Sequence, residues 1–220
     1  MLKTGLFTSK YVPARVPGPR EKVLVVFHGL GDSLQGFAWM PQELRLDGLS
    51  YLLVNAPDDY YGGFSWFEFA GGGLFMENAR PGILRSRKLI QGLLGELIAQ
   101  GIRPADIILF GFSQGCLMAL DAGLRSAQAL GGVCGVSGWL AFQDEYPAAF
   151  SPAAREQGFL VTHGLRDPLL PFAASAAQYA FLKTQGIRLD FKSYDKEHTI
   201  LPEELRDIRA WLAERMAAAA

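Results

Sequence analysis

The apolar residues of this chain gather in six short runs separated by polar and glycine-rich segments. The runs cover residues 23–27, 51–54, 107–110, 132–136, 159–162 and 189–194. Most of them are continuous rather than alternating, which is typical of parallel strands that are covered on both faces. We therefore interpret the six runs as the strands of one buried sheet.

Helical spacing of apolar side chains appears between these predicted strands. Residues 90–98 carry apolar side chains three and four positions apart, and Gly101 follows as a residue that commonly ends a helix. Residues 203–212 repeat the pattern directly after Pro202, which is favoured at the first position of a helix. The pattern predicts a helix in each of these segments.

The alternation of strand and helix continues over the whole length of the chain. It predicts a single domain over residues 1–220, of the α/β class, with a mostly parallel doubly wound sheet and helices on both faces. Sheets of this kind bind ligands outside the carboxyl ends of their strands. The alternation of strands and helices is interrupted at residues 56–73 and 137–157. We expect these two segments to be loops that line or cover a site.

The charge balance of the chain argues against a polyanionic partner. Its 21 Lys and Arg residues stand against 22 Asp and Glu residues, which leaves a formal charge of −1. Such a balance provides no field for attracting nucleic acid or an anionic membrane surface. A neutral or weakly polar small-molecule ligand fits it better.

The two cysteines and the lack of long apolar stretches indicate in which cellular compartment the protein is found. Cys116 and Cys134 both lie in apolar runs, where reduced, packed thiols are usual. The amino-terminal segment lacks the apolar core of a signal peptide, and no stretch reaches the roughly 18 apolar residues of a membrane span. We therefore expect a cytoplasmic protein without integral membrane association.

A serine between two glycines marks the most informative position. Ser113 lies in the motif GFSQG at residues 111–115, directly after a predicted strand and before another apolar stretch. The G-x-S-x-G pattern is weak by itself, but in a strand-to-helix context it is typical of a sharp turn that exposes a nucleophilic serine. Because a serine hydroxyl needs a base to accept its proton, the chemistry also requires a histidine.

Three histidines compete for the role of base. Where a nucleophilic serine lies on such a turn, the order along the chain is serine, acid, histidine, and only His163 and His198 follow Ser113. His198 lies in the loop between the last predicted strand and the last helix, which favours it as the base. We interpret His28 and His163 as structural residues that hold loops by hydrogen bonds.

The acid that orients this base is predicted to be Asp167. It follows the strand ending at Thr162 by a short turn, which places it at the same edge of the sheet as the serine. Asp144 is the reserve candidate. Asp195 is so close to His198 in the sequence that reaching the imidazole ring would need an unusual bend.

Two backbone N–H groups are expected to stabilise the negative oxygen of a reaction intermediate. In enzymes with this turn, one donor belongs to the residue after the nucleophile, here Gln114. The other comes from a loop after an early strand, here HGLGD at residues 28–32, in which we expect the Leu30 N–H to point inward.

With these residues assigned, the chain resembles the carboxylesterase/phospholipase family of α/β-hydrolases, a group that includes the acyl-protein thioesterases. The matching segments are HGLGDSLQGF (28–37), NAP (55–57), SWFEF (65–69), GFSQG (111–115), VSGWL (136–140), HGLRDPLLP (163–171) and EHTILPEELRDIRAWL (197–212). The resemblance implies a single α/β-hydrolase domain that hydrolyses carboxylic esters, and in some members acyl thioesters or lysophospholipids, without a cofactor or metal.

Carried onto this chain, the resemblance implies Ser113, Asp167 and His198 as the catalytic residues, with the Leu30 and Gln114 amides as oxyanion donors. It also implies that Trp66, Trp139 and Leu170 form an apolar acyl pocket. The expected partner is a small-molecule acyl ester or thioester. The sequence leaves undecided whether the protein forms a homodimer.

The chain also departs from the family pattern. Cys116 stands where relatives usually have glycine, and DKEH at residues 195–198 replaces the usual glycine before the histidine. The alternative function is a catalytically silent protein that binds a lipid or peptide in the apolar cleft, because a fold by itself does not guarantee an activity.

Overall fold

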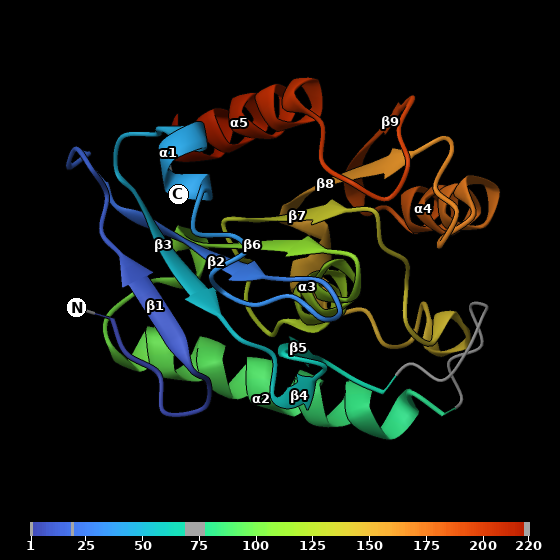
Figure 1. Ribbon diagram of the computed structural model, residues 1–220, viewed down its shortest axis with the longest axis horizontal. Helices are drawn as coiled ribbons and strands as arrows, with labels where there is room; N and C mark the ends of the chain where they lie inside the picture. The colour runs from blue at the N-terminus through green and yellow to red at the C-terminus, as the bar shows by residue number, and fades with distance from the viewer. Residues whose placement is uncertain (1, 19, 69–77, 218–220) are drawn as a thin grey trace.

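A seven-stranded sheet forms the centre of the protein (Figure 1). The structure is a computed structural model, and it describes residues 2–18, 20–68 and 78–217. The strand order is β1-β3-β2-β6-β7-β8-β9, in which β1 is antiparallel to β3 and every other neighbouring pair is parallel. The strands are β1 (Ser9–Val12), β2 (Lys22–Phe27), β3 (Leu49–Val54), β6 (Ile107–Phe112), β7 (Gly132–Val136), β8 (Gly158–Gly164) and β9 (Arg188–Tyr194).

The six apolar runs all fold as strands of this sheet, which confirms the prediction of a mostly parallel α/β fold. In β2 and β3 every residue is buried, as expected for strands with helices on both faces. The pattern did not indicate β1, a short edge strand whose residues are mostly half-exposed. Its pairing with β3, Ser9 opposite Val54, closes one edge of the sheet.

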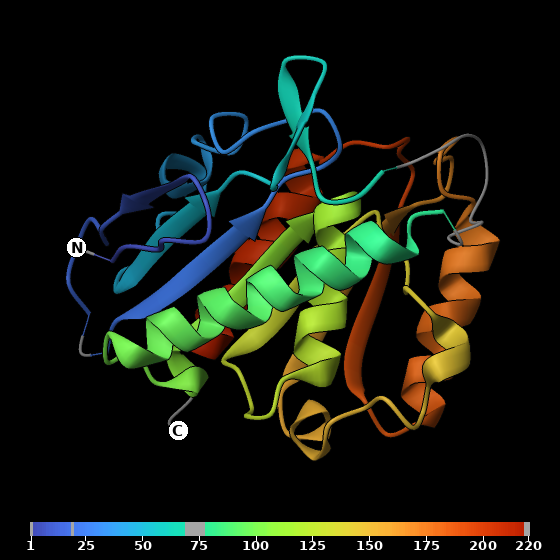
Figure 2. The ribbon, with the colours of Figure 1, turned by 90° about the horizontal axis from the view of Figure 1, so that it is seen from below.

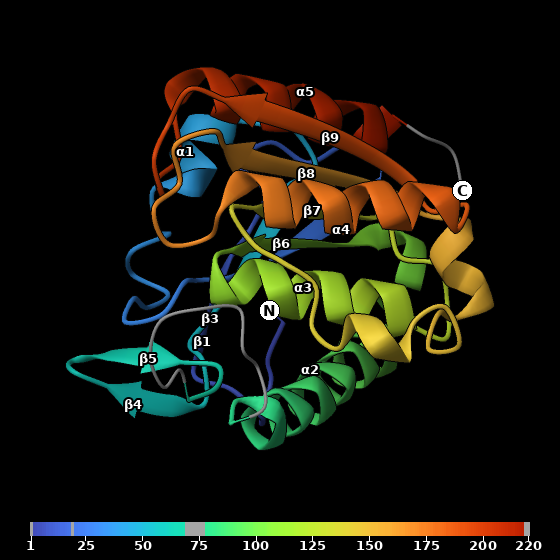
Figure 3. The ribbon, with the colours of Figure 1, turned by 90° about the vertical axis from the view of Figure 1, so that its right-hand side faces the viewer.

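Helices cover both faces of the sheet, as predicted (Figure 3). The helices are α1 (Met40–Leu44), α2 (Arg80–Ala99), α3 (Gln114–Arg125), α4 (Phe172–Thr184) and α5 (Pro202–Ala217). α1 and α5 pack in one apolar cluster on one face, with Leu44 and Trp211 among its members. α2, α3 and α4 share the cluster on the other face, with Leu93 and Leu182 among its members.

The two segments expected to be loops contain short regular elements. Residues 56–68 include the hairpin of β4 (Asp58–Tyr60) and β5 (Gly63–Ser65), which projects beyond the sheet in Figure 2. The rest of that predicted loop, residues 69–73, lies outside the described residues. The second segment contains the 3-10 turns η2 (Gln143–Glu145) and η3 (Pro152–Arg155), and a third turn, η1 (Pro104–Asp106), precedes β6.

Candidate active site

Ser113 lies where β6 ends and α3 begins, near the middle of the sheet. Its backbone has φ = 55° and ψ = −118°, a conformation that costs a serine local backbone strain. The Ser113 N–H donates to the carbonyl of Val136 in β7 at 2.9 Å, which fixes the turn to the neighbouring strand. The serine of the GFSQG motif therefore occupies the sharp strand-to-helix turn that the motif predicts.

The two glycines of the motif are required by close backbone contacts. A Cβ on Gly111 would lie 2.1 Å from the carbonyl oxygen of Gly115, in the first turn of α3. A Cβ on Gly115 would lie 2.2 Å from the carbonyl oxygen of Phe27, at the end of β2. Any side chain at either position would push the helix away from the strands and move Ser113.

His198 faces Ser113 from the loop between β9 and α5. Its Nε2 lies 2.9 Å from the Ser113 Oγ, and its Nδ1 lies 2.7 Å from Oδ2 of Asp167. An ionised carboxylate only accepts hydrogen bonds, so Nδ1 carries the proton and Nε2 accepts from the serine hydroxyl. The Phe112 ring packs beside the imidazole, with ring centroids 5.0 Å apart.

Asp167 lies in the loop after β8, and its side chain is fully buried. While Oδ2 contacts His198, Oδ1 accepts the N–H groups of Leu169 and Leu170 at 3.0 and 2.9 Å. Three hydrogen bonds therefore fix the orientation of the carboxylate.

The two other candidates for the acid lie away from His198. Asp195 is exposed and pairs with Arg166 at 2.5 Å. Asp144 belongs to the exposed turn η2. Asp167 is thus the candidate that the fold brings to the imidazole.

Leu30 and Gln114, the predicted oxyanion donors, border the same cavity as Ser113. Gln114 is the first residue of α3, so its backbone N–H has no acceptor within the helix. The loop of Leu30 is held in place by the hairpin, because the Gly31 N–H donates to the Phe64 carbonyl at 2.9 Å. The role of these two N–H groups stays a prediction.

The side chain of Gln114 has a structural role that the sequence did not reveal. Its Oε1 accepts the Trp66 N–H at 3.0 Å, and its Nε2 donates to the Phe67 carbonyl at 3.0 Å. The amide therefore joins the serine turn to the segment after β5. A glutamine beside a nucleophilic serine is a weak signal, because its partners are backbone atoms far away in the sequence.

His28 and His163 hold loops, as the sequence predicts for structural histidines. His28 donates from Nδ1 to the Gly29 carbonyl at 2.6 Å and accepts the Ala56 N–H on Nε2 at 3.0 Å. His163 donates from Nε2 to the Leu170 carbonyl at 2.9 Å. Burial lowers the pKa of both histidines below the ordinary value, which keeps the rings neutral.

A buried ion pair supports the loop that carries His198. The Lys196 Nζ lies 2.6 and 2.7 Å from the two carboxylate oxygens of Glu204, and both side chains are fully buried. The same ammonium donates to the Thr199 carbonyl at 2.6 Å. Lys196 belongs to the DKEH departure from the family pattern, and Glu204 belongs to the first turn of α5. The unusual DKEH segment was the signal in the sequence, but it did not indicate that Glu204 is the partner of Lys196.

A cavity of about 640 Å³ opens beside the Ser113 hydroxyl. Its walls are mostly apolar, and they include Trp139 and Leu170, two of the three residues implied as the acyl pocket. The remaining lining residues are Gly29, Leu30, Asp32, Phe112, Gln114, Pro168, Leu169, Pro171 and His198. A cavity of this size accommodates a small ligand with an apolar chain.

Trp66 does not line this cavity, so the pocket assigned from the resemblance needs correction at this residue. Trp66 is completely buried and packs against Phe27 with ring centroids 5.1 Å apart. Its indole N–H donates to the His28 carbonyl at 2.9 Å. The ring belongs to the core under the hairpin because both its apolar surface and its polar N–H are satisfied there.

Two properties of the described residues bear on cofactors and membranes. Among them, no three His, Cys, Asp or Glu side chains gather closely enough to hold a metal ion. None of the described helices combines the length and the apolar character needed to cross a bilayer.

Comparisons with known proteins point to one family. A family model described as phospholipase/carboxylesterase matches residues 14–216. The chain is 31% identical over 212 residues to acyl-protein thioesterase 1 of Gibberella zeae, an alignment that covers 88% of this chain and 90% of the relative. It is also 31% identical over 222 residues to a probable carboxylesterase of Oryza sativa, covering 94% of this chain and 82% of the relative. The crystal structure of esterase PE8 superposes with a TM-score of 0.83 at 29% identity, covering 94% of this chain and 98% of that one.

Proposed function

The chain belongs to the phospholipase/carboxylesterase family of α/β-hydrolases, and from this premise we propose that it cleaves acyl esters and thioesters through a covalent intermediate on Ser113. Membership of this family makes it an esterase of the serine-hydrolase type. The proposal adds the residues that carry the reaction and treats residues 1–220 as one catalytic domain.

In the first half of the reaction, the Ser113 Oγ attacks the acyl carbonyl carbon while His198 Nε2 accepts its proton. Asp167 stabilises the resulting imidazolium through the bond to Nδ1. The carbonyl oxygen becomes negative and accepts hydrogen bonds from the Leu30 and Gln114 amides, and each donor of this kind lowers a barrier by roughly 2.7–4 kcal/mol. Collapse of the intermediate leaves the acyl group on Ser113, and His198 returns its proton to the departing alkoxide or thiolate.

In the second half, water attacks the acyl-serine with His198 again acting as the base. The same two amides bind the oxyanion, the Ser113 Oγ leaves and takes back the proton, and the carboxylic acid departs. The cycle consumes only the acyl substrate and one water molecule, and it returns Ser113 and His198 to their starting states.

One observation carries the proposal: an unbroken row of hydrogen bonds runs from the Ser113 hydroxyl through His198 to Asp167, at 2.9 and 2.7 Å. The three residues come from three separate loops at the carboxyl ends of the strands. A row that joins a strained serine to a buried carboxylate through a histidine has no comparable use in packing.

Variants of Ser113 and His198 test the assignment directly. We expect Ser113→Ala and His198→Ala each to lower kcat for a p-nitrophenyl ester by roughly 10⁴- to 10⁶-fold, with a double variant little worse than either one, because the residues act as a unit. Losses that multiply in the double variant would show that one of the two residues is misassigned.

The acyl preference is addressed by a substrate series. Trp139 and Leu170 give the cavity an apolar wall, so we propose that kcat/KM rises with chain length as long as the added methylene groups lie against this wall. A series of p-nitrophenyl esters from acetate to palmitate, set against an acyl thioester and a lysophospholipid, measures this dependence. A flat series would contradict binding of the acyl chain in this cavity.

A further inference from the structure

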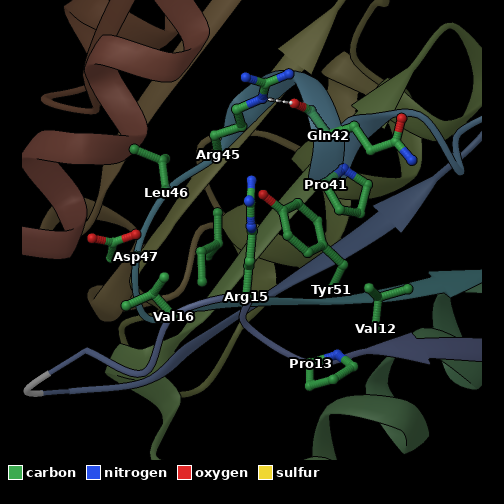
Figure 4. Close-up of a pocket in the computed structure, with 11 residues that line it drawn as sticks. Val12, Pro13, Arg15, Val16, Pro41, Gln42, Arg45, Leu46, Asp47 and Tyr51 are labelled. Carbon is green, nitrogen blue, oxygen red and sulfur yellow. Dashed lines mark hydrogen bonds between the residues drawn. The ribbon is translucent and has the colours of Figure 1, made fainter.

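A second cavity, of about 580 Å³, lies between the end of β1, the helix α1 and the first half of β3 (Figure 4). Val12, Val16, Leu46 and Leu49 are among its apolar lining residues. Its polar lining residues are Arg15, Gln42, Arg45, Asp47 and Tyr51. Its volume falls within the range of small-molecule sites.

This cavity is separate from the one beside Ser113. The two share no lining residue. Leu49 begins β3, whose partner β2 runs parallel to it and ends beside the serine turn, so the second cavity lies at the opposite end of the strands. A ligand could therefore occupy it without touching the catalytic groups.

The Tyr51 hydroxyl is the unusual feature of this cavity. Tyr51 is only 3% exposed, and its hydroxyl is buried without a hydrogen-bond partner in the described part of the chain. A buried hydroxyl that lacks a partner destabilises the fold, because it has lost its hydrogen bonds to water without replacing them. Burial also raises the phenol pKa to about 12, so the group stays a neutral donor. An acceptor that entered the cavity would satisfy it.

Two guanidinium groups border the same space. Arg15 and Arg45 are both exposed, and neither has an ion-pair partner within the described ranges. The Arg45 Nε donates to the Gln42 carbonyl at 2.5 Å, which holds this side chain at the rim. In Figure 4 the Arg15 side chain and the Tyr51 ring extend into the same part of the cavity. Hydrogen-bond donors and positive charge thus surround an apolar floor.

We propose that this cavity binds a carboxylate that carries an apolar chain. The carboxylate would accept hydrogen bonds from Arg15 and, after a turn of that exposed side chain, from the Tyr51 hydroxyl, while the chain lies against Val12, Val16 and Leu49. Guanidinium groups are well suited to carboxylates because their N–H groups match the two oxygens.

The charge of the lining favours a monoanion over a phosphate. Arg15 and Arg45 contribute two positive charges and Asp47 one negative charge, which leaves a single net positive charge. A phosphate monoester carries about −1.5 to −2 at neutral pH and would leave excess negative charge near Asp47. Carboxylates with apolar chains are also the products of ester hydrolysis, so such a ligand arises wherever the enzyme acts.

The site is tested by observing Tyr51 itself during titration with octanoate. In protein labelled with ¹³Cζ-tyrosine, the Tyr51 resonance is identified by its loss in Tyr51→Phe. We expect octanoate to shift this resonance in a saturable manner, which separates binding here from binding beside Ser113. Arg15→Gln should raise the Kd at least about fivefold, as expected for loss of a hydrogen bond to a charged group. Arg188→Gln, an exposed arginine on β9, serves as the control and should leave the Kd unchanged.

Matched ligands separate the outcomes. We expect 1-octanol to give no saturable shift and octyl phosphate to bind more weakly than octanoate. Calorimetry on protein whose Ser113 is blocked by a phosphonate should show weaker octanoate binding in Tyr51→Phe than in the unchanged protein. The melting temperature of Tyr51→Phe should stay equal to that of the unchanged protein or rise. The proposal would be overturned if the Tyr51 resonance did not move at about 10 mM octanoate, or if octanol shifted it equally. It would also be overturned if octyl phosphate bound more tightly than octanoate, or if Arg15→Gln left the Kd for octanoate unchanged. Because Arg15 is exposed, its variant remains informative even if a Tyr51 variant fails to fold.

Discussion

Gly115 determines how closely α3 can approach the end of β2. We expect Gly115→Ala to lower the free energy of unfolding by about 1–3 kcal/mol or more, because its Cβ would lie 2.2 Å from the Phe27 carbonyl oxygen. The kcat of the folded variant should also fall, by more than its lost stability explains, since any relief of the clash moves Ser113. Urea unfolding and kcat measured on the same preparation test both effects.

Gly95 provides the matched control for this substitution. It lies at an exposed position in the second half of α2, where a Cβ would meet nothing within 4 Å. Gly95→Ala should raise the free energy of unfolding by about 0.5–1 kcal/mol, since alanine favours a helix more than glycine does. Equal effects of the two substitutions would contradict the packing argument at the serine turn.

At Asp167, the amide of an asparagine would impose the wrong tautomer on His198. The N–H groups of Leu169 and Leu170 require an acceptor at Oδ1, so the NH₂ group of Asp167→Asn would face Nδ1. His198 would then carry its proton on Nε2 and could not accept from Ser113. We expect kcat to fall by about 10⁴-fold with a nearly unchanged KM. Steady-state kinetics on an ester measure this, and a decrease of less than about tenfold would argue against Asp167 as the orienting acid.

Residue by residue, the sequence was informative where a motif or the order along the chain restricted the choice. Ser113, Asp167 and His198 follow from the GFSQG motif and the required order, and hydrogen bonds join them in the structure. Trp66 was misplaced because a tryptophan near a glycine-rich loop fits a core and a pocket equally well. The contacts of the Gln114 amide connect distant backbone atoms, which no local pattern encodes.

The connection between β9 and α5 depends on the buried Lys196–Glu204 pair. We expect Glu204→Gln to lower the free energy of unfolding by about 3–5 kcal/mol, because it leaves the Lys196 ammonium without its counterion in the protein interior. Burial already lowers the pKa of Lys196, and the Glu204 carboxylate counteracts this shift. Urea unfolding measures the loss.

The neighbouring Glu203 is exposed, so Glu203→Gln should change stability by less than about 0.5 kcal/mol. The double change Lys196→Met with Glu204→Leu should restore much of the lost stability, because a buried pair can often be replaced by apolar side chains. A double variant as unstable as Glu204→Gln alone would contradict this account of the loop.

Elements with strong apolar periodicity were predictable, and those with weak contrast were not. The six predicted strands, of which only β9 is mostly exposed, and helices α2 and α5 follow from their patterns. The segment of α4, FAASAAQYAFLKT, is rich in alanine and offers little contrast between its faces. β1 is a short edge strand with polar residues, and the β4–β5 hairpin is held by a few contacts to the loop of Leu30. Their positions depend on tertiary pairing that the local sequence does not specify.

For the whole molecule, the alternation of strands and helices was sufficient to predict the doubly wound sheet with helices on both faces. Parallel strands require helical crossovers, and those crossovers place the inner strands β2, β3, β6, β7 and β8 between two apolar layers. The second cavity lay beyond prediction, because Arg15 after β1, Arg45 after α1 and Tyr51 in β3 meet only in the folded chain.

The two buried histidines make the stability of the whole fold sensitive to acid. The pKa of His28 and of His163 is lowered in the folded protein, so the unfolded chain binds protons first as the pH falls through about 6.5. Their contribution to stability is therefore complete above that pH and is lost below it, by at most about 1.4 kcal/mol per pH unit for each proton. Urea unfolding at a series of pH values from 7.5 to 5 measures this slope.

The unfolding free energy should depend less steeply on pH in His163→Gln. This variant lacks one of the two titrating rings but keeps a group that can donate to the Leu170 carbonyl. An unfolding free energy that stays constant below pH 6.5 would contradict neutral, buried histidines.

The nucleophilic role of Ser113 is tested most directly by finding the atom that a fluorophosphonate modifies. Incubation of the folded protein with this reagent, followed by peptide mass spectrometry, should show one adduct on the peptide that contains Ser113. The adduct should be absent in Ser113→Ala and should form far more slowly in His198→Ala. Modification at another residue, or full esterase activity in Ser113→Ala, would contradict the account.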